Sequence, residues 1–262
     1  MMREAQQAQE RRWLAVSMLL AVAAFAVAPS FAQQPDGMVR IPSGTFVPFL
    51  EGPSAPPRPV PAFQMDRNAV TVGAFRNFLA ENERWQRGQV PAVFADQRYL
   101  QSLDSADANA PAVHVSWFAA RAYCEWVGKR LPTLDEWERA AAARDVLYPN
   151  ESEAAFATRI LQWYASPNPA RLPAVRSTYL NRLGLYDMHG LIWEWVLDFN
   201  QSTVTGDSRG DSELERNLFC GGASSQSRDP SDYAAFMRYA YRSSLRAAST
   251  APNLGFRCAR DL

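Results

Sequence analysis

The sequence is poor in the residue types that most often carry enzymatic chemistry. Its 262 residues include only three cysteines and two histidines. It contains no Cys-x-x-Cys motif, no glycine-rich phosphate loop and no arrangement typical of a Ser/His/Asp triad. These absences argue against a thioredoxin-like redox enzyme, a nucleotide hydrolase and a serine hydrolase.

The chain also lacks a net charge. It carries 27 basic and 27 acidic side chains, so it has no basic surplus for a nucleic-acid partner. Its strongest feature is apolar: hydrophobic residues make up 47% of the sequence, which includes eight tryptophans. This content predicts a sizeable core, and the length permits one large domain or two small ones.

The N-terminal segment predicts export. Arg11 and Arg12 precede an apolar run at 14–28, and the small residues up to Ala32 resemble a signal-peptide cleavage site. The alternative is an uncleaved membrane anchor, but the run is shorter than the roughly 20 apolar residues of a span. We therefore expect a signal peptide at 1–32, a mature domain at 33–262, a periplasmic or secreted location and no stable membrane anchor.

Residues 184–195 combine glycines, carboxylates and large aromatic residues, with Asp187 and Glu194 as the acids. Carboxylate and carbonyl oxygens are the ligands that Ca²⁺ prefers, and glycine lets carbonyls converge. The segment therefore indicates a loop around a hard cation. The alternative is an aromatic-rich turn in the core with two solvated acids.

Local patterns predict the regular elements. Alternation predicts strands at 38–46 and 63–66, whereas the five prolines of 51–61 predict a surface connection. Thr71, Ser116 and Thr133 are expected to cap helices that end near residues 83, 127 and 144. Segments 84–110 and 145–182 are predicted to be loops, residues 229–232 a turn or helix start, and strands are expected at 214–222 and 254–259.

Several motifs occur in one fixed order. They are Pro-Ala-Val-His-Val-Ser-Trp (111–117), Tyr-Cys-Glu-Trp (123–126), Gly-Lys-Arg-Leu-Pro-Thr (128–133), Glu-Trp-Glu (136–138) and Asn-Leu-Gly-Phe-Arg-Cys (253–258). Together with 185–195 they closely resemble the formylglycine-generating enzyme family, also called the sulfatase-modifying factor domain. The resemblance covers roughly residue 38 to the C-terminus. It implies a single compact α+β fold, similar to C-type lectins, with little regular secondary structure.

The resemblance implies a disulfide between Cys124 and Cys258, which an exported protein can keep. The family's signature activity uses two thiolates that bind copper, a soft ion that prefers sulfur ligands. Counting back from Tyr241 by the family's spacing places Tyr233 and Arg238 where those cysteines would stand. Cys220 is then alone, either as a small buried residue or as a reactive thiol. We therefore do not expect copper or formylglycine generation, and only Cys220 and Tyr233 are weak catalytic candidates.

The family's calcium motif maps onto four positions of the 184–195 segment. The side chains of Asp187 and Glu194 and the carbonyls of Gly190 and Ile192 would hold one structural Ca²⁺. The two histidines, His114 and His189, are expected to be structural.

A recognition groove is expected near the C-terminal motif. Arg238, Arg242 and Arg246 recur at intervals of four residues, so on a helix they would share one face. With Ser243 and Trp193 they would line a groove for an anionic or peptide ligand. The alternative is a set of solvated or salt-bridged arginines.

These inferences predict an exported protein of the family that is not a formylglycine generator. It would act in the recognition or maturation of another exported protein, peptide or small metabolite. The alternatives are a divergent metal-dependent oxidoreductase, for example of the siderophore-tailoring type, and a lectin-like binding module.

Overall fold

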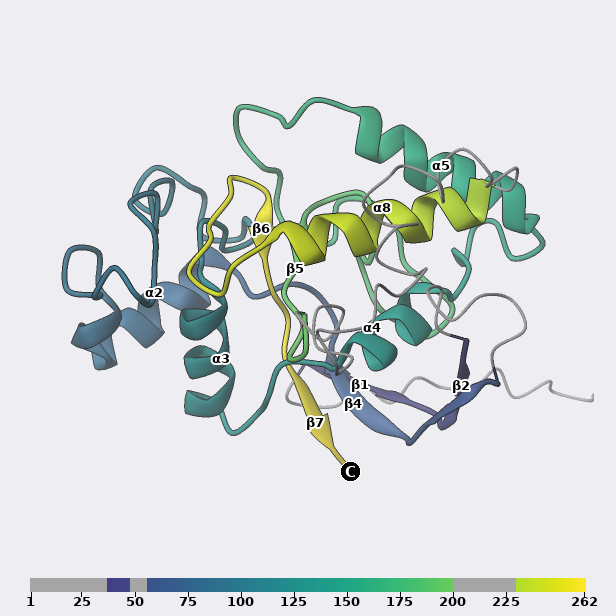
Figure 1. Cartoon of the computed structure of the whole chain (residues 1–262), viewed down its shortest axis with the longest axis horizontal. Coiled ribbons are helices and arrows are strands. Elements are labelled where there is room, and N and C mark those ends of the chain that lie inside the picture. Colours follow the sequence, from purple (N-terminus) through teal and green to yellow (C-terminus); the bar gives the residue numbers. More distant parts are fainter. Residues whose placement is uncertain (1–36, 48–55, 200–229) are drawn as a thin grey trace, which may run out of the picture. The chain divides into compact units, whose positions relative to one another are not determined.

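A computed structural model describes residues 37–47, 56–199 and 230–262 (Figure 1). The strands of the N-terminal part are β1 (Met38–Ile41), β2 (Gly44–Phe46), β3 (Arg58–Val60) and β4 (Phe63–Asp66). The later strands are β5 (Trp193–Glu194), β6 (Leu254–Gly255) and β7 (Ala259–Asp261). The helices are α2 (Val72–Glu81), η2 (Glu83–Trp85), α3 (Trp117–Trp126), α4 (Leu134–Ala141), α5 (Glu153–Ala165) and α8 (Pro230–Ser244). The predicted signal peptide, Cys220 and the predicted strand at 214–222 lie outside the described residues.

The main sheet joins the two ends of the domain. It has the strand order β1-β4-β7, and both pairings are antiparallel. β2 pairs with β3, and β5 pairs in parallel with β6. The predicted strands at 38–46 and 63–66 are confirmed, although β1 and β2 belong to different sheets.

This topology corrects two predictions, the surface connection at 51–61 and the closing strand at 254–259. The proline-rich connection contains β3, in which Pro59 faces Thr45 across a two-stranded pair. Proline is tolerated there because an edge strand need not donate every N–H. The predicted closing strand at 254–259 is divided, because β6 belongs to the β5 pair and β7 to the main sheet.

The three predicted helix caps are confirmed. The side chains of Thr71 and Ser116 accept hydrogen bonds from backbone N–H groups three residues later. Thr133 and Glu136 form a capping box at the start of α4. α3 is followed by Gly128, whose φ of 70° is a left-handed conformation suited to glycine. Local capping chemistry therefore fixes where α2, α3 and α4 begin.

One predicted loop contains a helix. α5 occupies Glu153–Ala165 inside the segment 145–182, and the Ser152 side chain caps it by accepting from Ala155 N–H. The prolines at 149 and 167 lie outside the helix and only bracket it. Proline disrupts a helix interior but not its flanks, so the loop prediction was wrong for these thirteen residues.

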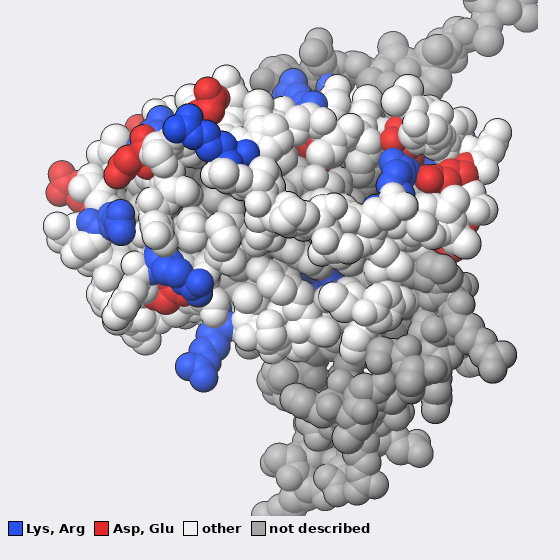
Figure 2. Space-filling model, turned by 90° about the horizontal axis from the view of Figure 1, so that it is seen from above, with Lys and Arg blue, Asp and Glu red and all other residues white. Residues whose placement is uncertain are grey.

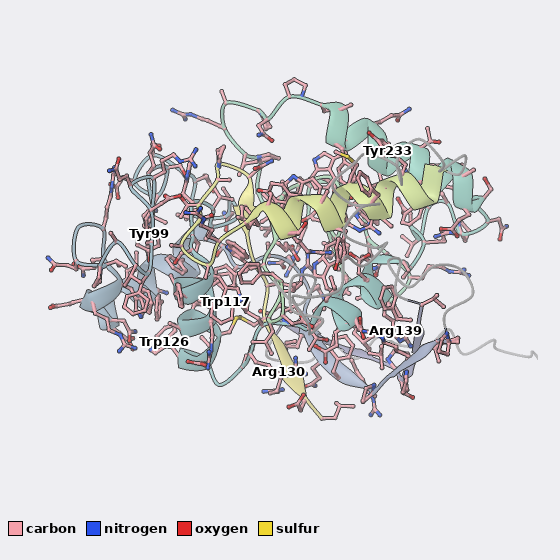
Figure 3. All side chains as sticks on the ribbon, in the orientation of Figure 1. Tyr99, Trp117, Trp126, Arg130, Arg139 and Tyr233 are labelled. Atoms are coloured by element: carbon pink, nitrogen blue, oxygen red, sulfur yellow. A yellow bond between two sulfur atoms is a disulfide. The ribbon has the colours of Figure 1, made fainter. Side chains whose placement is uncertain are left out.

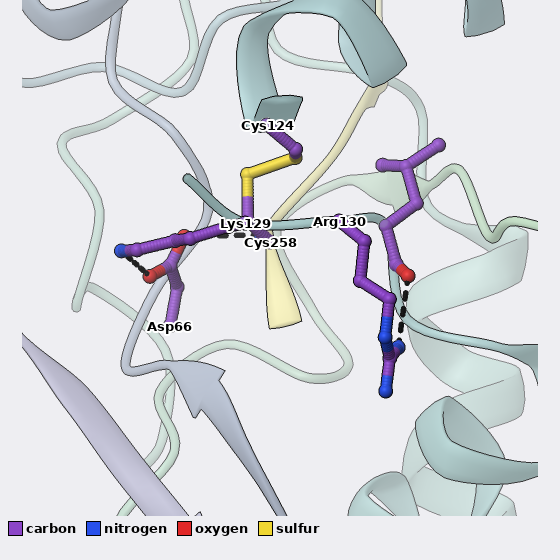
Figure 4. The surroundings of a disulfide bond; sticks show 6 residues. Asp66, Cys124, Lys129, Arg130 and Cys258 are labelled. Atoms are coloured by element: carbon purple, nitrogen blue, oxygen red, sulfur yellow. Dashed lines mark hydrogen bonds and ion pairs between the residues drawn. A yellow bond between two sulfur atoms is a disulfide. The ribbon is translucent and has the colours of Figure 1, made fainter. Parts of the chain in front are cut away.

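A continuous apolar core lies between the main sheet and α2, α3 and α4, with Phe63, Phe75 and Trp195 among its members. A disulfide joins Cys124 of α3 to Cys258 just before β7, in the pairing that the resemblance implies (Figure 4). Its sulfur atoms are 2.01 Å apart, and both cysteines are fully buried. Beside it, Lys129 Nζ donates to Asp66 at 2.6 Å. The covalent link thus holds the last strand against the helical layer.

α5 and α8 lie side by side, away from α2 and α3 (Figure 1). They share a small apolar cluster of their own, made by Phe156, Ala157, Ile160 and Ala234. Among the described helices, none is both long and apolar enough to cross a membrane. α8 confirms the predicted helix start near residue 230 and places Arg238 and Arg242 on one helix.

Candidate functional site

The centre of the site is a carboxylate on α4 that binds two arginines of α8. Arg238 Nε lies 3.0 Å from both carboxylate oxygens of Glu138, and its Nη2 lies 2.8 Å from Oε2. Arg242 Nη1 donates to Oε1 at 2.5 Å. The three side chains are only 7–12% exposed. Charge-assisted hydrogen bonds therefore attach α8 to α4.

The charges of this cluster act strongly on one another. Burial alone would raise the pKa of Glu138, but Arg238 and Arg242 outweigh burial and lower it to about 2. Burial works against the charged form of Arg238, yet the Glu138 carboxylate raises its pKa above the ordinary value. Glu138 and Arg238 are therefore charged across the physiological pH range.

A stack of aromatic rings adjoins the cluster. Trp193 of β5 has its ring centroid 4.7 Å from that of Tyr164 and 4.5 Å from that of Tyr241. Trp163 lies next to the same indole at 5.4 Å. Arg238 Nη1 donates to the Tyr164 hydroxyl at 3.3 Å, which links the stack to the ion cluster. The stack thus connects α5, β5 and α8, and Trp193 is half-buried within it.

The Tyr241 hydroxyl in this stack is buried and has no hydrogen-bond partner among the described residues. Burial raises the pKa of this phenol to about 12. The group is therefore a neutral donor at physiological pH.

The other predicted groove residues have different surroundings. The Ser243 hydroxyl donates to the carbonyl of Tyr239 at 2.9 Å within α8, and this side chain is exposed. Arg246 lies just past the end of the helix with an exposed side chain. Tyr233 lies near the first turn of α8 and is 39% exposed (Figure 3). The structure therefore brings Trp193, Arg238 and Arg242 into one region, with Arg246 at its exposed end.

The predicted calcium ligands are engaged by protein donors. Asp187 accepts from the N–H of Arg176, and from the N–H and hydroxyl of Thr178 at 2.9 and 2.7 Å. Glu194 accepts from Arg257 at both oxygens, at 2.8 Å each, and from Trp137 Nε1 at 2.8 Å. The described part of the chain holds no group of three or more His, Cys, Asp or Glu placed for a metal ion.

A Ca²⁺ ion at these positions would have to replace some of these donors, because both carboxylates already accept hydrogen bonds and Arg257 pairs with Glu194. Calcium held by Asp187, Glu194 and the carbonyls of Gly190 and Ile192 stays a prediction. The function proposed below does not depend on it.

Both histidines are buried, as a structural role requires. Burial, and next the charge of Arg238, lowers the pKa of His189 to about 3. Its Nε2 lies 3.3 Å from the Ala141 carbonyl, and its ring packs edge-on against Trp137 and Phe156. Burial also lowers the pKa of His114, which has a left-handed φ of 55°. Both imidazoles are therefore neutral at physiological pH.

Sequence reasoning missed Glu138, Tyr164 and Tyr241 as members of the site. Glu138 belongs to the Glu-Trp-Glu motif, but its partners lie 100 and 104 residues away. Tyr164 is at the end of α5, which was predicted to be a loop. The Ser152 cap before an alanine-rich run was the signal that would have revealed this helix.

Comparison with known proteins defines the class of the chain. The model of the sulfatase-modifying factor enzyme 1-like domain matches residues 24–262. The chain belongs to this family, and the mixed α and β architecture is the sulfatase-modifying-factor fold that the motifs predict.

Individual relatives show how far the likeness extends. The formylglycine-generating enzyme of Streptomyces coelicolor is 36% identical over 170 residues, which cover 58% of this chain and 53% of that enzyme. The inactive C-alpha-formylglycine-generating enzyme 2 of Bos taurus is 33% identical over 163 residues, covering 57% and 50%. The chain therefore spans about half the length of each. The structure of PvdO from Pseudomonas aeruginosa is 21% identical, with a TM-score of 0.45 and coverage of 86% of this chain and 94% of that one.

Proposed function

We propose that this chain is an exported protein of the sulfatase-modifying-factor family that does not generate formylglycine. It recognises another exported protein, a peptide or a small metabolite through the α8 region, and it assists the maturation of that molecule. The proposal depends on how many cysteines the sequence contains and on which of them are paired.

Only three cysteines occur in the sequence, and two of them form the Cys124–Cys258 disulfide. One thiol, that of Cys220, is left, whereas the copper chemistry of the family needs two neighbouring thiolates. A bovine relative that is named inactive shows that the family includes members without the activity. Both points support a role other than cysteine oxidation.

The α8 region supports recognition as that role. It combines half-buried aromatic rings with arginines that run from the buried Glu138 cluster to the exposed Arg246. Aromatic side chains and arginines are enriched where proteins bind partners, because they combine large contact area with directional hydrogen bonds.

The test uses the purified mature protein. We expect one free thiol per chain, no stoichiometric copper by elemental analysis, and no aldehyde when the protein is incubated with copper and a cysteine-containing substrate peptide. Conversion of the peptide cysteine into formylglycine with turnover would overturn the proposal.

A divergent metal-dependent oxidoreductase is the second candidate, favoured by the enzymatic relatives of the chain. It requires stoichiometric copper or iron in the purified protein, and loss of activity on Cys220→Ser or Tyr233→Phe substitution. Recognition without chemistry requires neither metal, and it leaves both variants with unchanged binding. A lectin-like module would add affinity for a glycan without turnover.

A further inference from the structure

We propose that Arg238 and Arg242 form the buried part of a carboxylate-binding site, in which a ligand supplies a second carboxylate beside that of Glu138. This inference rests on the recognition function proposed above and names the chemical class of the ligand. The site lies where α4, α8 and the aromatic stack meet.

The charges of the cluster do not balance. Two guanidinium groups share one carboxylate, and no other carboxylate of the described residues forms an ion pair with Arg238 or Arg242. Within the described residues, the cluster therefore carries one positive charge in excess, at side chains that are 7% and 12% exposed. A buried charge is costly unless it is paired, so an anion at this place would be favourable.

Asp198 is a described carboxylate whose pKa is influenced by the charge of Arg242. Its carboxylate accepts from Leu134 N–H at 2.6 Å, and Arg242 acts on it only as a weaker charge effect. Burial is the main influence on Asp198 and raises its pKa. Asp198 therefore caps the start of α4 and does not take the place of a direct partner for Arg242.

The geometry of Arg242 also suits a carboxylate ligand. Its guanidinium carbon lies 4.6 Å from the centre of the Trp137 ring, so the indole fixes the plane of the group. Among the described residues, only its Nη1 has a protein acceptor, which is Glu138. Arg238 differs, because Glu138, Tyr164 and the Ala234 carbonyl accept from it. A planar guanidinium with unused N–H groups suits a carboxylate, which accepts two parallel hydrogen bonds.

The surroundings of the arginines indicate which ligands can approach. In the face shown in Figure 2, most charged side chains lie toward the two ends, and much of the middle is formed by other residues. Arg246, which follows Arg238 and Arg242 at intervals of four residues, has an exposed side chain. The aromatic rings stacked around Trp193 offer an apolar surface for the rest of a ligand. The expected ligand therefore joins a carboxylate to an uncharged organic part.

The experiment measures thermal unfolding and tryptophan fluorescence of the mature protein in sodium acetate and in sodium chloride of equal ionic strength. We expect acetate to raise Tm in a saturable manner and to change the fluorescence, since Trp137 lies against Arg242. Trialanine with a free C-terminus should act at lower concentration than butyrate if the ligand is a peptide, and at higher concentration if it is a small carboxylic acid. Trialanine amide should have no effect.

The matched variants are Arg242→Lys and Arg121→Lys. Arg242→Lys keeps the charge that pairs with Glu138 but loses the planar fork, so acetate affinity should fall at least tenfold. Arg121, in an exposed pair with Glu125, serves as the control, and its variant should bind as the wild type does. If Arg242→Lys does not fold, a crystal structure of the wild type in acetate replaces it, with a carboxylate expected on Arg242.

Equal Tm curves in acetate and chloride, or a crystal structure with no carboxylate on Arg242, would overturn this proposal. Either result leaves the proposed function standing, because that depends on the copper and aldehyde measurements. Aldehyde formation would instead overturn the proposed function whatever the acetate experiment shows.

Discussion

The sheet with its helical layer and the α5–α8 pair are held together by different forces. The first has one continuous apolar core, reinforced by the buried Cys124–Cys258 disulfide. The second has a cluster of only four buried apolar residues, and α8 is attached to α4 through Glu138.

Apolar burial and the disulfide therefore determine the fold, whereas buried ion pairs position the residues of the candidate site. Apolar burial depends little on pH or salt, whereas buried ion pairs depend on protonation and on every partner being present. The α5–α8 pair should therefore respond to acid and to single charge changes that the sheet tolerates. Four experiments test this contrast.

Removal of the disulfide should have the largest effect and should act on the sheet. The loop that it closes has a sequence separation of 134, which corresponds to roughly 4–5 kcal/mol in the chain-entropy model. We expect the Cys124→Ala/Cys258→Ala variant to lose about this free energy of unfolding in denaturant titrations. A loss below about 1 kcal/mol would show that the core alone holds β7.

Acidification should destabilise the α5–α8 side next. The folded pKa of His189 is lowered to about 3, so the unfolded chain binds more protons below its ordinary value of about 6.5. Stability should therefore fall as pH decreases from 6.5 toward 3, by on the order of 4 kcal/mol. Glu138, with a folded pKa of about 2, adds a further loss between about pH 4.5 and 2.

Chemical denaturation at several pH values measures this dependence. His114 titrates in the same direction, because burial lowers its pKa as well. The His114→Gln/His189→Gln variant should therefore lose most of the slope above pH 4.5. If the stability of this variant depended on pH as strongly as that of the wild type, the two histidines would not be the cause of the pH dependence.

Glu138→Gln should cost about 3 kcal/mol, because it leaves two arginines buried without a carboxylate. Glu125→Gln is its control: Glu125 pairs with Arg121 at the surface, where both side chains are more than half exposed, and should cost less than about 0.5 kcal/mol. Hydrogen exchange should show the loss in α8 before β4. Equal losses of stability in Glu138→Gln and Glu125→Gln would contradict the greater dependence of the α5–α8 pair on its buried ion pairs.

Gly255→Ala should have the smallest effect, about 2 kcal/mol, and should act on the β5–β6 pair. A Cβ atom at this position would lie 2.4 Å from the Ala112 carbonyl oxygen and 2.8 Å from Ile192 Cδ1, so the backbone must shift. Gly88→Ala has open space and only a positive φ, and it should cost about 1 kcal/mol. Thermal unfolding of both variants checks the ranking.

The sequence predicted those parts of the fold that depend on interactions between residues close together in the chain. Thr71, Ser116 and Thr133 each cap a helix through contacts three residues away, and such contacts can be recognised in sequence. The ordered motifs added the family and its fold. α5 was missed because the flanking prolines were given more weight than the Ser152 cap.

The interactions of the candidate site were less predictable because they are long-range. The arginine series was recognised, but its partner Glu138 is 100 residues from Arg238. The pairing of Glu194 with Arg257, 63 residues away, is of the same kind. Charge partners are set by tertiary packing, which a single sequence pattern does not encode.

The pairing of β7 with β4 has a consequence for biosynthesis. Met65 lies opposite Ala259, so most of the chain is translated between the two strands. Until residues 259–261 arrive, β4 keeps an open edge, and such edges invite association with other chains. Nascent molecules should therefore depend on a holding chaperone, and ribosome-bound chains that stop before residue 259 should remain sensitive to protease.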